Sequence, residues 1–291
     1  MASSRLTGVP AQVLVLISII SVQVGAAIGR SVFDEIGAAG VTLLRVGIAA
    51  VVLLVALRPA LRSWSRASWR AAIVLGVTMA AMNLTFYLSL RTVPLGVAVT
   101  VEFLGPLALA LVQTRRVADL LWVVLAGAGV ALLGLDSASD IPVSGLLLAG
   151  LAGVFWAGYI LASAHLGQTL PGMDGLAISL VVASLLVLPF GFEGAVRALD
   201  DPVVLATAAA VAILSSVIPY GLELEALRRI PTRVFGILMS MEPAAGALAG
   251  WIVLSQGLSA RELLAMLLVS LASLGVTLGR RTEDLSLLPL E

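Results

Sequence analysis

Long apolar stretches separated by short polar connections dominate the chain. A segment needs about 20 mostly apolar residues to cross a bilayer, because every backbone N–H and C=O must be satisfied inside it. Charged residues, glycine and proline gather in the connections, none of which is long enough for a soluble domain. The pattern predicts an all-α polytopic membrane protein. Its ten predicted transmembrane helices cover residues 11–29, 37–57, 71–90, 93–113, 118–135, 143–163, 174–192, 202–223, 232–254 and 261–279.

The same short motif occurs in both halves of the chain. Leu90–Pro94 and Leu227–Pro231 end in prolines that lie 137 residues apart, and the next prolines, Pro106 and Pro243, have the same separation. This offset is close to half of the 291 residues, which indicates internal duplication. We therefore expect two five-helix repeats, at residues 1–138 and 139–291.

Composition supports membrane insertion. Hydrophobic residues make up 60% of the chain and charged residues 12%, with a mean hydropathy of +1.11. This leaves too little polar surface to cover a soluble protein, so the lipid bilayer is an expected partner.

The first apolar run has an alternative interpretation. Arg5 precedes it, and the small residues Gly25–Ala27 could serve as a cleavage site, as in a secretory signal. Removing this run would leave nine spans and break the repeat of five and five. We therefore interpret it as the first membrane helix.

The arginines predict the orientation. The chain has 17 basic and 17 acidic residues, and every basic residue is an arginine. With the N-terminus inside, the cytoplasmic segments hold 12 arginines and the opposite side holds four, while Arg45 lies within a span. Basic residues are retained on the cytoplasmic side, so both termini are expected there. Because each half has an odd number of spans, the second repeat should be inverted relative to the first.

Prolines interrupt the fourth and ninth predicted spans. Pro94 and Pro231 fit the first turn of these helices, where the missing N–H costs nothing. Pro106 and Pro243 fall inside them, where each would kink the helix and free the carbonyl four residues earlier. We expect these two kinked helices, one in each half, to be gates beside a central site.

Polar residues within the spans are the candidate substrate-binding or coupling groups. Glu102 and Glu242 lie in the two interrupted spans, and a carboxylate buried without a partner takes up a proton or binds a cation. A static ion pair with Arg45 is the alternative. Four further polar stripes are predicted to face the interior: Gln23, Asn83 with Tyr87, Trp156 with Tyr159, and Tyr220 with Glu223. For Trp156 and Tyr159, anchoring at the lipid interface is an equal alternative.

The sequence lacks the signature motifs of several protein classes. The sequence contains no cysteine and a single histidine, His165, which the span limits place in a connection. Zinc hydrolase, serine hydrolase and nucleotide-binding motifs are absent, so we predict no enzyme, metal site or cofactor. The arginines of residues 58–70 are interpreted as a topology signal, not as a nucleic-acid site. A channel fits inverted halves with kinked helices less well than a carrier does.

A small-residue pattern, Gly246–Gly250, allows close helix approach. We interpret it as internal packing, and a homodimer contact is the alternative.

Taken together, these motifs resemble those of the drug/metabolite transporter superfamily with two EamA-type halves, and most closely those of the bacterial threonine/homoserine exporters. The resemblance covers almost the whole chain, although Gly221 and Glu225 depart from its pattern. The motifs that carry it are Gln23, Gly25–Ala26, Arg30–Ser31, Arg45, Phe86–Ser89, Thr92–Val99, Glu102–Leu107, Trp156, Tyr159–Leu161, Ala212–Ser215, Pro219–Tyr220, Pro231–Arg233, Phe235–Gly236 and Leu238–Ala244.

The resemblance implies an exporter in the bacterial plasma (inner) membrane, with a small neutral amino acid such as threonine or homoserine as its substrate. A proton or ion gradient would drive it. A zwitterion needs an anion near its ammonium group, which Glu102 or Glu242 could supply, and donors near its carboxylate, which Arg45, Asn83 or Tyr220 could supply. Export of another metabolite or of a drug is the alternative within the same superfamily.

Overall fold

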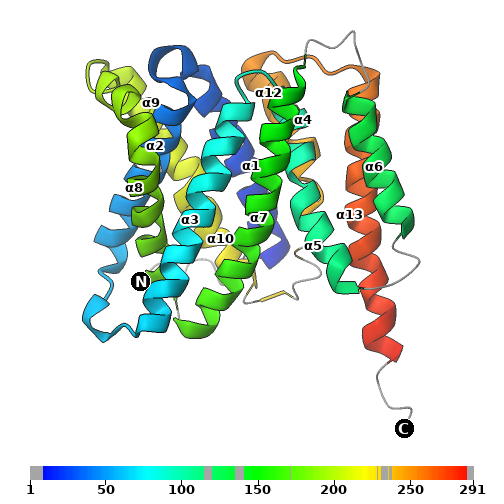
Figure 1. Cartoon of the computed structure of the whole chain (residues 1–291), viewed down its shortest axis with the longest axis horizontal. Coiled ribbons are helices and arrows are strands. Elements are labelled where there is room, and N and C mark those ends of the chain that lie inside the picture. Colours follow the sequence, from blue (N-terminus) through cyan, green and yellow to red (C-terminus); the bar gives the residue numbers. More distant parts are fainter. Residues whose placement is uncertain are drawn as a thin grey trace.

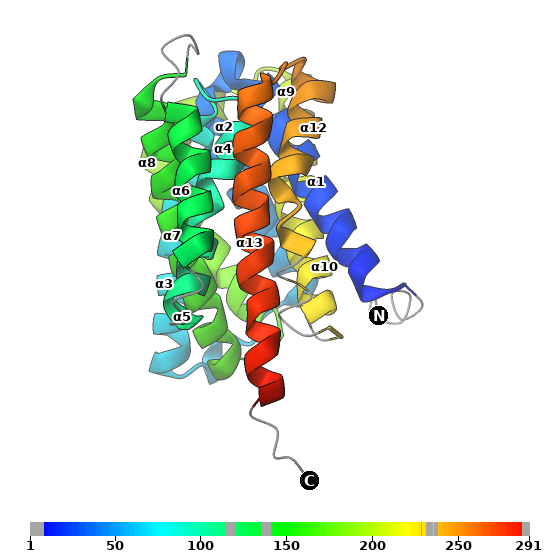
Figure 2. The same ribbon diagram turned by 90° about the vertical axis from the view of Figure 1, so that its right-hand side faces the viewer.

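The structure is a computed structural model that describes residues 9–114, 120–134, 141–170, 172–227, 229–230, 235 and 238–286. Within these residues the regular structure is helical, and the helices run side by side along one direction (Figures 1 and 2). Residues that supported the predictions but lie outside the described part are Arg5, Arg115, Arg116, Arg228, Pro231 and Arg233.

In the described part of the first half, the α-helices are α1(Ala11–Ser31), α2(Phe33–Leu57), α3(Arg66–Ser89), α4(Leu95–Glu102), α5(Leu104–Thr114) and α6(Leu120–Gly134), with a short 3-10 helix, η1(Leu61–Ser63), between α2 and α3. Local sequence explains their starts. Ser65 accepts a hydrogen bond from the backbone N–H of Ser68 at 3.1 Å and so caps α3. Pro94 precedes α4 at its N-cap, close to its predicted place in the first turn.

The second half contributes α7(Val143–Thr169), α8(Asp174–Arg197), α9(Pro202–Ala212), the π-helix η3(Ile213–Val217), α10(Ile218–Leu227), α12(Glu242–Leu254) and α13(Ala260–Ser286). Asp201 caps α9 by accepting from the backbone N–H of Val203 at 2.8 Å. The prediction that His165 lies in a connection is wrong: α7 continues beyond residue 163 and contains it.

Among the described residues, six helical segments are long and apolar enough to cross a membrane: Ala11–Ser31, Phe33–Leu57, Arg66–Ser89, Val143–Thr169, Asp174–Arg197 and Pro202–Glu223. Two further apolar segments, Leu95–Leu109 and Glu242–Leu254, are shorter. The prediction of an all-helical protein is thus confirmed for the described residues, with several helices that could span a membrane. The count of ten spans stays a prediction.

Both proline-containing spans are interrupted three residues before the interior proline, and Phe103 at the first interruption keeps helical backbone angles, which fits the predicted kink. α4 ends at Glu102 and α5 begins at Leu104, so the break falls at Phe103. In the second half a turn at Ser240 precedes α12, and Ser240 lies 137 residues after Phe103. Pro106 and Pro243 therefore occupy the first turns of α5 and α12. A proline is tolerated there because its missing N–H has no helical partner to lose.

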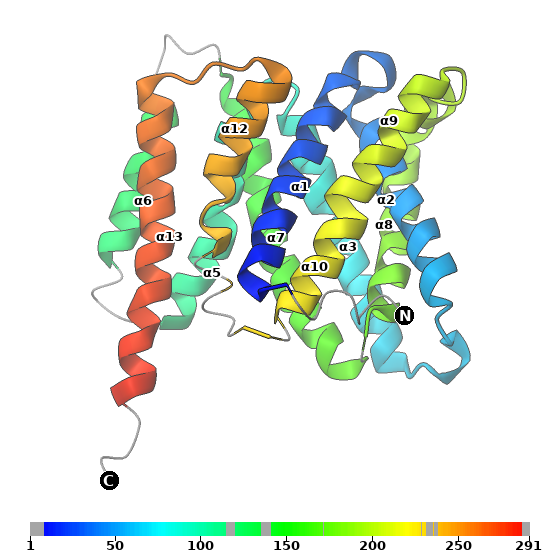
Figure 3. The same ribbon diagram turned by 180° about the vertical axis from the view of Figure 1, so that it is seen from behind.

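The helices of the two halves interleave in the bundle. α2 packs on α8, α3 on α7, α6 on α13, α4 on α12, and α1 on α10. Figure 3 shows α1 beside α10 and α12, with α1 beginning and α13 ending at the same end of the bundle. We call this the N-terminal end, and we call the opposite end, where α1 turns into α2, the corner end.

Close helix contacts depend on glycine at particular places. A Cβ added at Gly105 would lie 1.8 Å from the carbonyl oxygen of Gly153, so α7 crosses directly over the break after α4. A Cβ at Gly246 would lie 3.1 Å from Val99 on α4. The Gly246–Gly250 pattern therefore serves internal packing, as predicted.

Candidate functional site: a buried polar cavity beside the helix breaks

A cavity of about 110 Å³ lies among helices of both halves, and we call it the central cavity. Its lining comes from α1, α2, α3, α4, α7, α10, α12 and the π-helix η3. Nine of the ten predicted site residues line it: Gln23, Arg45, Asn83, Glu102, Trp156, Tyr159, Tyr220, Glu223 and Glu242. The tenth, Tyr87, is fully buried (0% exposed) and is not among the lining residues. The fold thus brings together polar groups that are up to 219 residues apart in sequence.

Three carboxylates line this cavity. Glu102 is the last residue of α4 and Glu242 the first of α12, and they are 8% and 6% exposed. The N-terminal end of α12 favours a negative charge at Glu242, whereas the C-terminal end of α4 disfavours one at Glu102. Glu223 accepts a hydrogen bond from the Ser18 hydroxyl at 2.6 Å. A site of this kind can hold a cationic group or exchange a proton.

Arg45 is held by the π-helix. Its Nη2 donates to the Ser215 carbonyl at 2.6 Å and its Nε to the Ser216 hydroxyl at 3.1 Å. Its guanidinium also lies 5.4 Å from the centre of the Tyr87 ring. Among the contacts of the described residues, Arg45 forms no ion pair with Glu102 or Glu242. The alternative of a static ion pair does not describe this structure.

The π-helix η3 contacts α1 and α2 and leads directly into α10. A π-helical turn leaves backbone carbonyls out of the i→i−4 ladder, and two of them are used here: Ser215 O by Arg45, and Leu214 O by the Ser21 hydroxyl at 2.7 Å. A Cβ at Gly25 would lie 2.2 Å from the Ser215 hydroxyl oxygen, so α1 needs glycine to approach this closely. These contacts fix α1, α2 and the start of α10 around the cavity.

Gln23 Oε1 and the Tyr87 hydroxyl are buried without a hydrogen-bond partner among the described residues. The side-chain amide of Asn83 makes one hydrogen bond, in which its Nδ2 donates to the Met79 carbonyl at 2.8 Å. An unpaired acceptor on a lining side chain is costly to bury. Gln23 is consequently suited to receive a donor from a bound solute.

Aromatic rings form one wall of the cavity. Trp156 meets the Phe103 ring edge-on at 5.6 Å, which places it against the break between α4 and α5. Tyr159 and Tyr220 approach each other at 6.4 Å between α7 and α10. Both Trp156 and Tyr159 line the cavity, a location that fits the interior interpretation of this stripe.

Sequence reasoning missed several contributing residues. Ser18 bonds Glu223, Ser215 and Ser216 hold Arg45, and Phe86 and Met239 are among the other lining residues. Helical spacing could have revealed Ser215, because it precedes Pro219 by four residues and Glu223 by eight. Serine is common in apolar helices, where it satisfies itself on the preceding turn, so its signal is weak.

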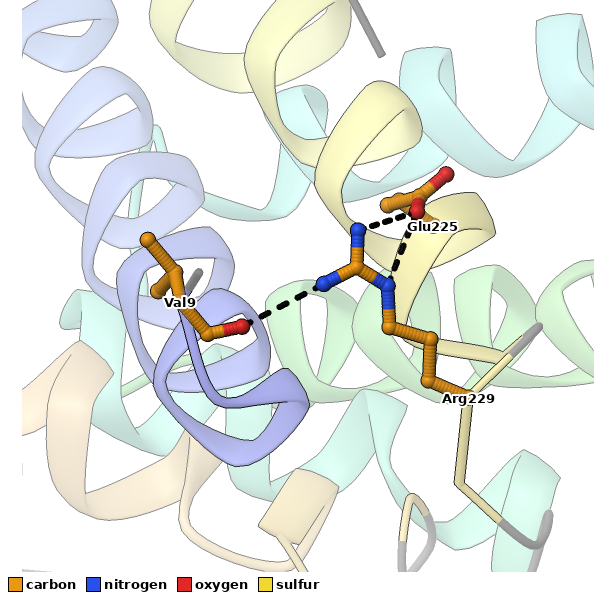
Figure 4. Close-up of polar contacts among 3 residues, drawn as sticks. All are labelled: Val9, Glu225 and Arg229. Carbon is orange, nitrogen blue, oxygen red and sulfur yellow. Dashed lines mark hydrogen bonds and ion pairs between the residues drawn. The ribbon is translucent and has the colours of Figure 1, made fainter. Parts of the chain in front are cut away.

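Glu225, one of the two departures from the family pattern, lies away from the central cavity. It forms an ion pair with Arg229, four residues later, and the two side chains are 20% and 23% exposed. Arg229 Nη1 also donates to the Val9 carbonyl at 3.3 Å (Figure 4). This contact ties the end of α10 to the residues just before α1, at the N-terminal end of the bundle.

Apolar helices that are interrupted beside a buried, charged cavity define a polytopic membrane transport protein. Comparison with known proteins gives the family. Residues 143–278 match the EamA-like transporter family. The chain is 42% identical over 275 residues to the threonine/homoserine exporter RhtA of Escherichia coli K12, in a match that covers 94% of this chain and 92% of that protein. The chain belongs to the EamA-like transporter family, and it is a transporter and not an enzyme.

Other relatives agree with this assignment. RhtA of Salmonella typhimurium LT2 is 40% identical over 273 residues, covering 93% of this chain and 92% of that protein. An uncharacterized transporter of Bacillus subtilis, YwfM, is 25% identical over 231 residues, or 76% of this chain and 77% of its own. One solved crystal structure, 17% identical, superimposes with a TM-score of 0.59 over 94% of this chain and 98% of its own, so the two share a fold.

Proposed function

We propose that this protein exports small neutral amino acids of the threonine or homoserine type across the bacterial plasma membrane. Export proceeds by alternating access around the central cavity and is coupled to a proton or ion gradient. The observation that carries the proposal is the cavity itself, because it places one arginine, three glutamates and an unpaired amide oxygen inside a bundle of apolar helices.

The cavity has the groups that a zwitterion requires. An ammonium group can be bound by Glu102 or Glu242 together with the unpaired Gln23 oxygen. A carboxylate can be bound by the remaining donors of Arg45 or by the hydroxyl of Tyr220. With a volume of about 110 Å³, the cavity is smaller than the roughly 300–1,000 Å³ of pockets for drug-sized ligands. The size supports a small solute over a drug, and the names of the RhtA relatives support the same choice.

Alternating access follows from the proposed inverted repeat of residues 1–138 and 139–291. Two observations support this division. The helix breaks at Phe103 and Ser240 have the same 137-residue offset as the prolines. The helix contacts also occur in pairs related by that offset, since α3 packs on α7 just as α10 packs on α1. In two inverted units of this kind, rocking of one against the other opens a shared site to either face.

The proposed orientation puts both termini in the cytoplasm and the corner end outside. Cysteine accessibility tests this cleanly because the chain has no cysteine of its own. Single cysteines introduced at Arg66 and Arg229 should both react with a membrane-impermeant reagent from the cytoplasmic side only. Reaction of the two positions from opposite sides would reject the inverted arrangement.

Counterflow in proteoliposomes tests the cargo. Vesicles loaded with unlabelled threonine or homoserine should accumulate the labelled amino acid transiently, and unrelated amino acids should not compete. Saturable flux with counterflow also separates a carrier from a channel. If neither amino acid stimulates exchange, the cargo is another metabolite or a drug, and a panel of efflux substrates becomes the next measurement.

Glu102 and Glu242 are the proposed coupling groups. Glu102→Gln and Glu242→Gln keep the shape of each side chain but cannot release a proton at neutral pH. We expect at least one variant to lose gradient-driven flux while keeping counterflow, which needs no net proton movement. Full gradient-dependent flux in both variants would exclude coupling through these glutamates.

A further inference from the structure

A second cavity, of about 470 Å³, lies at the corner end of the bundle, and we call it the corner cavity. It shares no lining residue with the central cavity. Its walls come from the end of α1, the start of α2, the end of α3 and the end of α8. Five of its lining side chains are charged: Arg30, Asp34, Arg91, Glu193 and Arg197. Glu193 and Arg197 pair with each other, so Arg30, Asp34 and Arg91 supply the charges of both signs that a zwitterionic solute requires.

Tyr87 lies next to lining residues of both cavities. Nearby residues of α3 divide between them: Phe86 lines the central cavity, Leu88 lines the corner cavity, and Tyr87 lies between with 0% exposure. The Tyr87 ring is 5.8 Å from the Phe86 ring and 6.0 Å from the ring of Phe33, which lines the corner cavity. Tyr87 thus contacts a lining residue of each cavity.

Each cavity also contributes an arginine beside these aromatic rings. Arg45, in the central cavity, lies 5.4 Å from the Tyr87 ring centre, and Arg30, in the corner cavity, lies 4.9 Å from that of Phe33. Cation–π contacts of this kind hold an aromatic ring without fixing it through hydrogen bonds. Arg30 is anchored independently, because its Nε donates to the Leu90 carbonyl at 2.7 Å.

The pair of Phe33 and Tyr87 has the features of a movable element. The Tyr87 hydroxyl is buried without a hydrogen-bond partner among the described residues, so the closed position carries a cost that rotation toward either cavity would relieve. Gly37 has φ +70° and ψ 160° inside α2 and interrupts the helix one turn after Phe33. The turn that carries Phe33 is therefore attached through a residue whose backbone is not helical.

We propose that Phe33 and Tyr87 form the outer gate of the transporter and that the corner cavity is the chamber through which the solute leaves. This inference rests on the proposed function and goes beyond it by naming the exit route. Swinging the turn of Phe33 about Gly37 would uncover the Tyr87 ring and join the two cavities.

Cysteine reporters in the full-length chain test the gate. Met82→Cys supplies the central-cavity reporter and Leu88→Cys the corner-cavity reporter, each as the single cysteine of its chain. The probe is a cationic, membrane-impermeant methanethiosulfonate applied from outside. We expect the corner-cavity reporter to react at the same rate in every background. The central-cavity reporter should react about tenfold faster when Phe33→Ala is added, since the closed state then loses its outer ring. Phe33→Leu is the milder variant, to be used if Phe33→Ala yields no folded protein.

Gly37→Ala tests the hinge. An added methyl at Gly37 meets no atom within 4 Å, so only its backbone conformation is strained. We expect lower maximal flux with unchanged KM. Gly127→Ala is the matched control, because its added methyl also meets nothing and its φ is not positive.

The outcomes are distinguishable. Reaction of the corner-cavity reporter from the cytoplasmic side only would overturn the exit route. An unchanged rate at the central-cavity reporter with both Phe33 variants would overturn the gate. If these labelling results hold but threonine and homoserine give no counterflow, the proposed cargo fails and the gate stands. If counterflow is present and labelling is unchanged, the gate fails and the cargo stands.

Discussion

The crossing of α7 over the break after α4 gives the sharpest prediction about stability. Gly105→Ala would place a methyl 1.8 Å from the Gly153 carbonyl oxygen and 2.3 Å from its carbonyl carbon. Ordinary contact begins at 3.4 Å, so the two segments must separate by about 1.6 Å, the difference between 3.4 and 1.8. Both neighbours are backbone atoms, and no side-chain rotation can relieve the clash. Overpacking of a core costs about 1–3 kcal/mol, and we expect the upper end here.

Thermal unfolding of the purified full-length protein in one detergent measures this cost. A loss of about 3 kcal/mol should lower Tm by at most about 6–12 °C, taking the value of about 2–4 °C per kcal/mol for domains of roughly 150–250 residues as the upper bound for this longer chain. Gly153→Ala should lower Tm less, because its methyl meets the Glu102 carbonyl at 2.4 Å. Gly127→Ala should raise Tm slightly, since alanine stabilises an open helical position by about 0.5–1 kcal/mol.

The glycine variants should rank in transport activity as they rank in Tm. Displacing α7 from the break moves Trp156, one turn beyond Gly153, relative to Glu102 in the central cavity. Gly105→Ala should therefore lose counterflow even at temperatures where it stays folded. The reasoning is refuted if Gly105→Ala melts at or above the temperature of Gly127→Ala and transports normally.

Three further variants test contacts outside the central cavity. Ser65→Ala removes the N-cap of α3, whose hydroxyl accepts from the backbone N–H of Ser68. It should lower stability by about 1 kcal/mol and leave transport flux unchanged. A loss of flux at full stability would contradict this. Arg229→Gln weakens the hold of α10 on Val9, and should speed amide exchange in the first turn of α1 but not in α8. Gln256→Ala leaves the first N–H of α4 without its acceptor at 3.0 Å, and should lower stability by about 1 kcal/mol, measured as Tm.

Much of the fold could be predicted from apolar runs and proline spacing. Segments such as 11–29 and 202–223 correspond to helices because a bilayer requires uninterrupted apolar helices, and that requirement is visible in any window of about 20 residues. The breaks at Phe103 and Ser240 were less predictable. A proline tells where a helical hydrogen bond is missing, but whether the helix bends or ends depends on the segment packed against it, here α7 at Gly153.

The candidate site, like the fold, could be predicted from the sequence only in part. Stripes such as Asn83 and Tyr87 could be found from helical periodicity, because polar groups on an apolar helix are predicted to face the interior. Periodicity could not show that Tyr87 lies behind the cavity and not on its wall. It also could not show that Arg45 bonds a π-helix instead of a glutamate, since a π-helical turn has no simple sequence signature.

The sequence by itself determined that this chain is a polytopic membrane transporter and which polar residues it buries, because the cost of placing polar groups in lipid constrains every span locally. Only the tertiary structure decided which of those residues meet and which cavity each one faces. Contacts such as Ser18 with Glu223, or Phe33 with Tyr87, depend on the relative rotation and depth of separate helices. Those quantities are set by close packing between helices, which no single helix encodes.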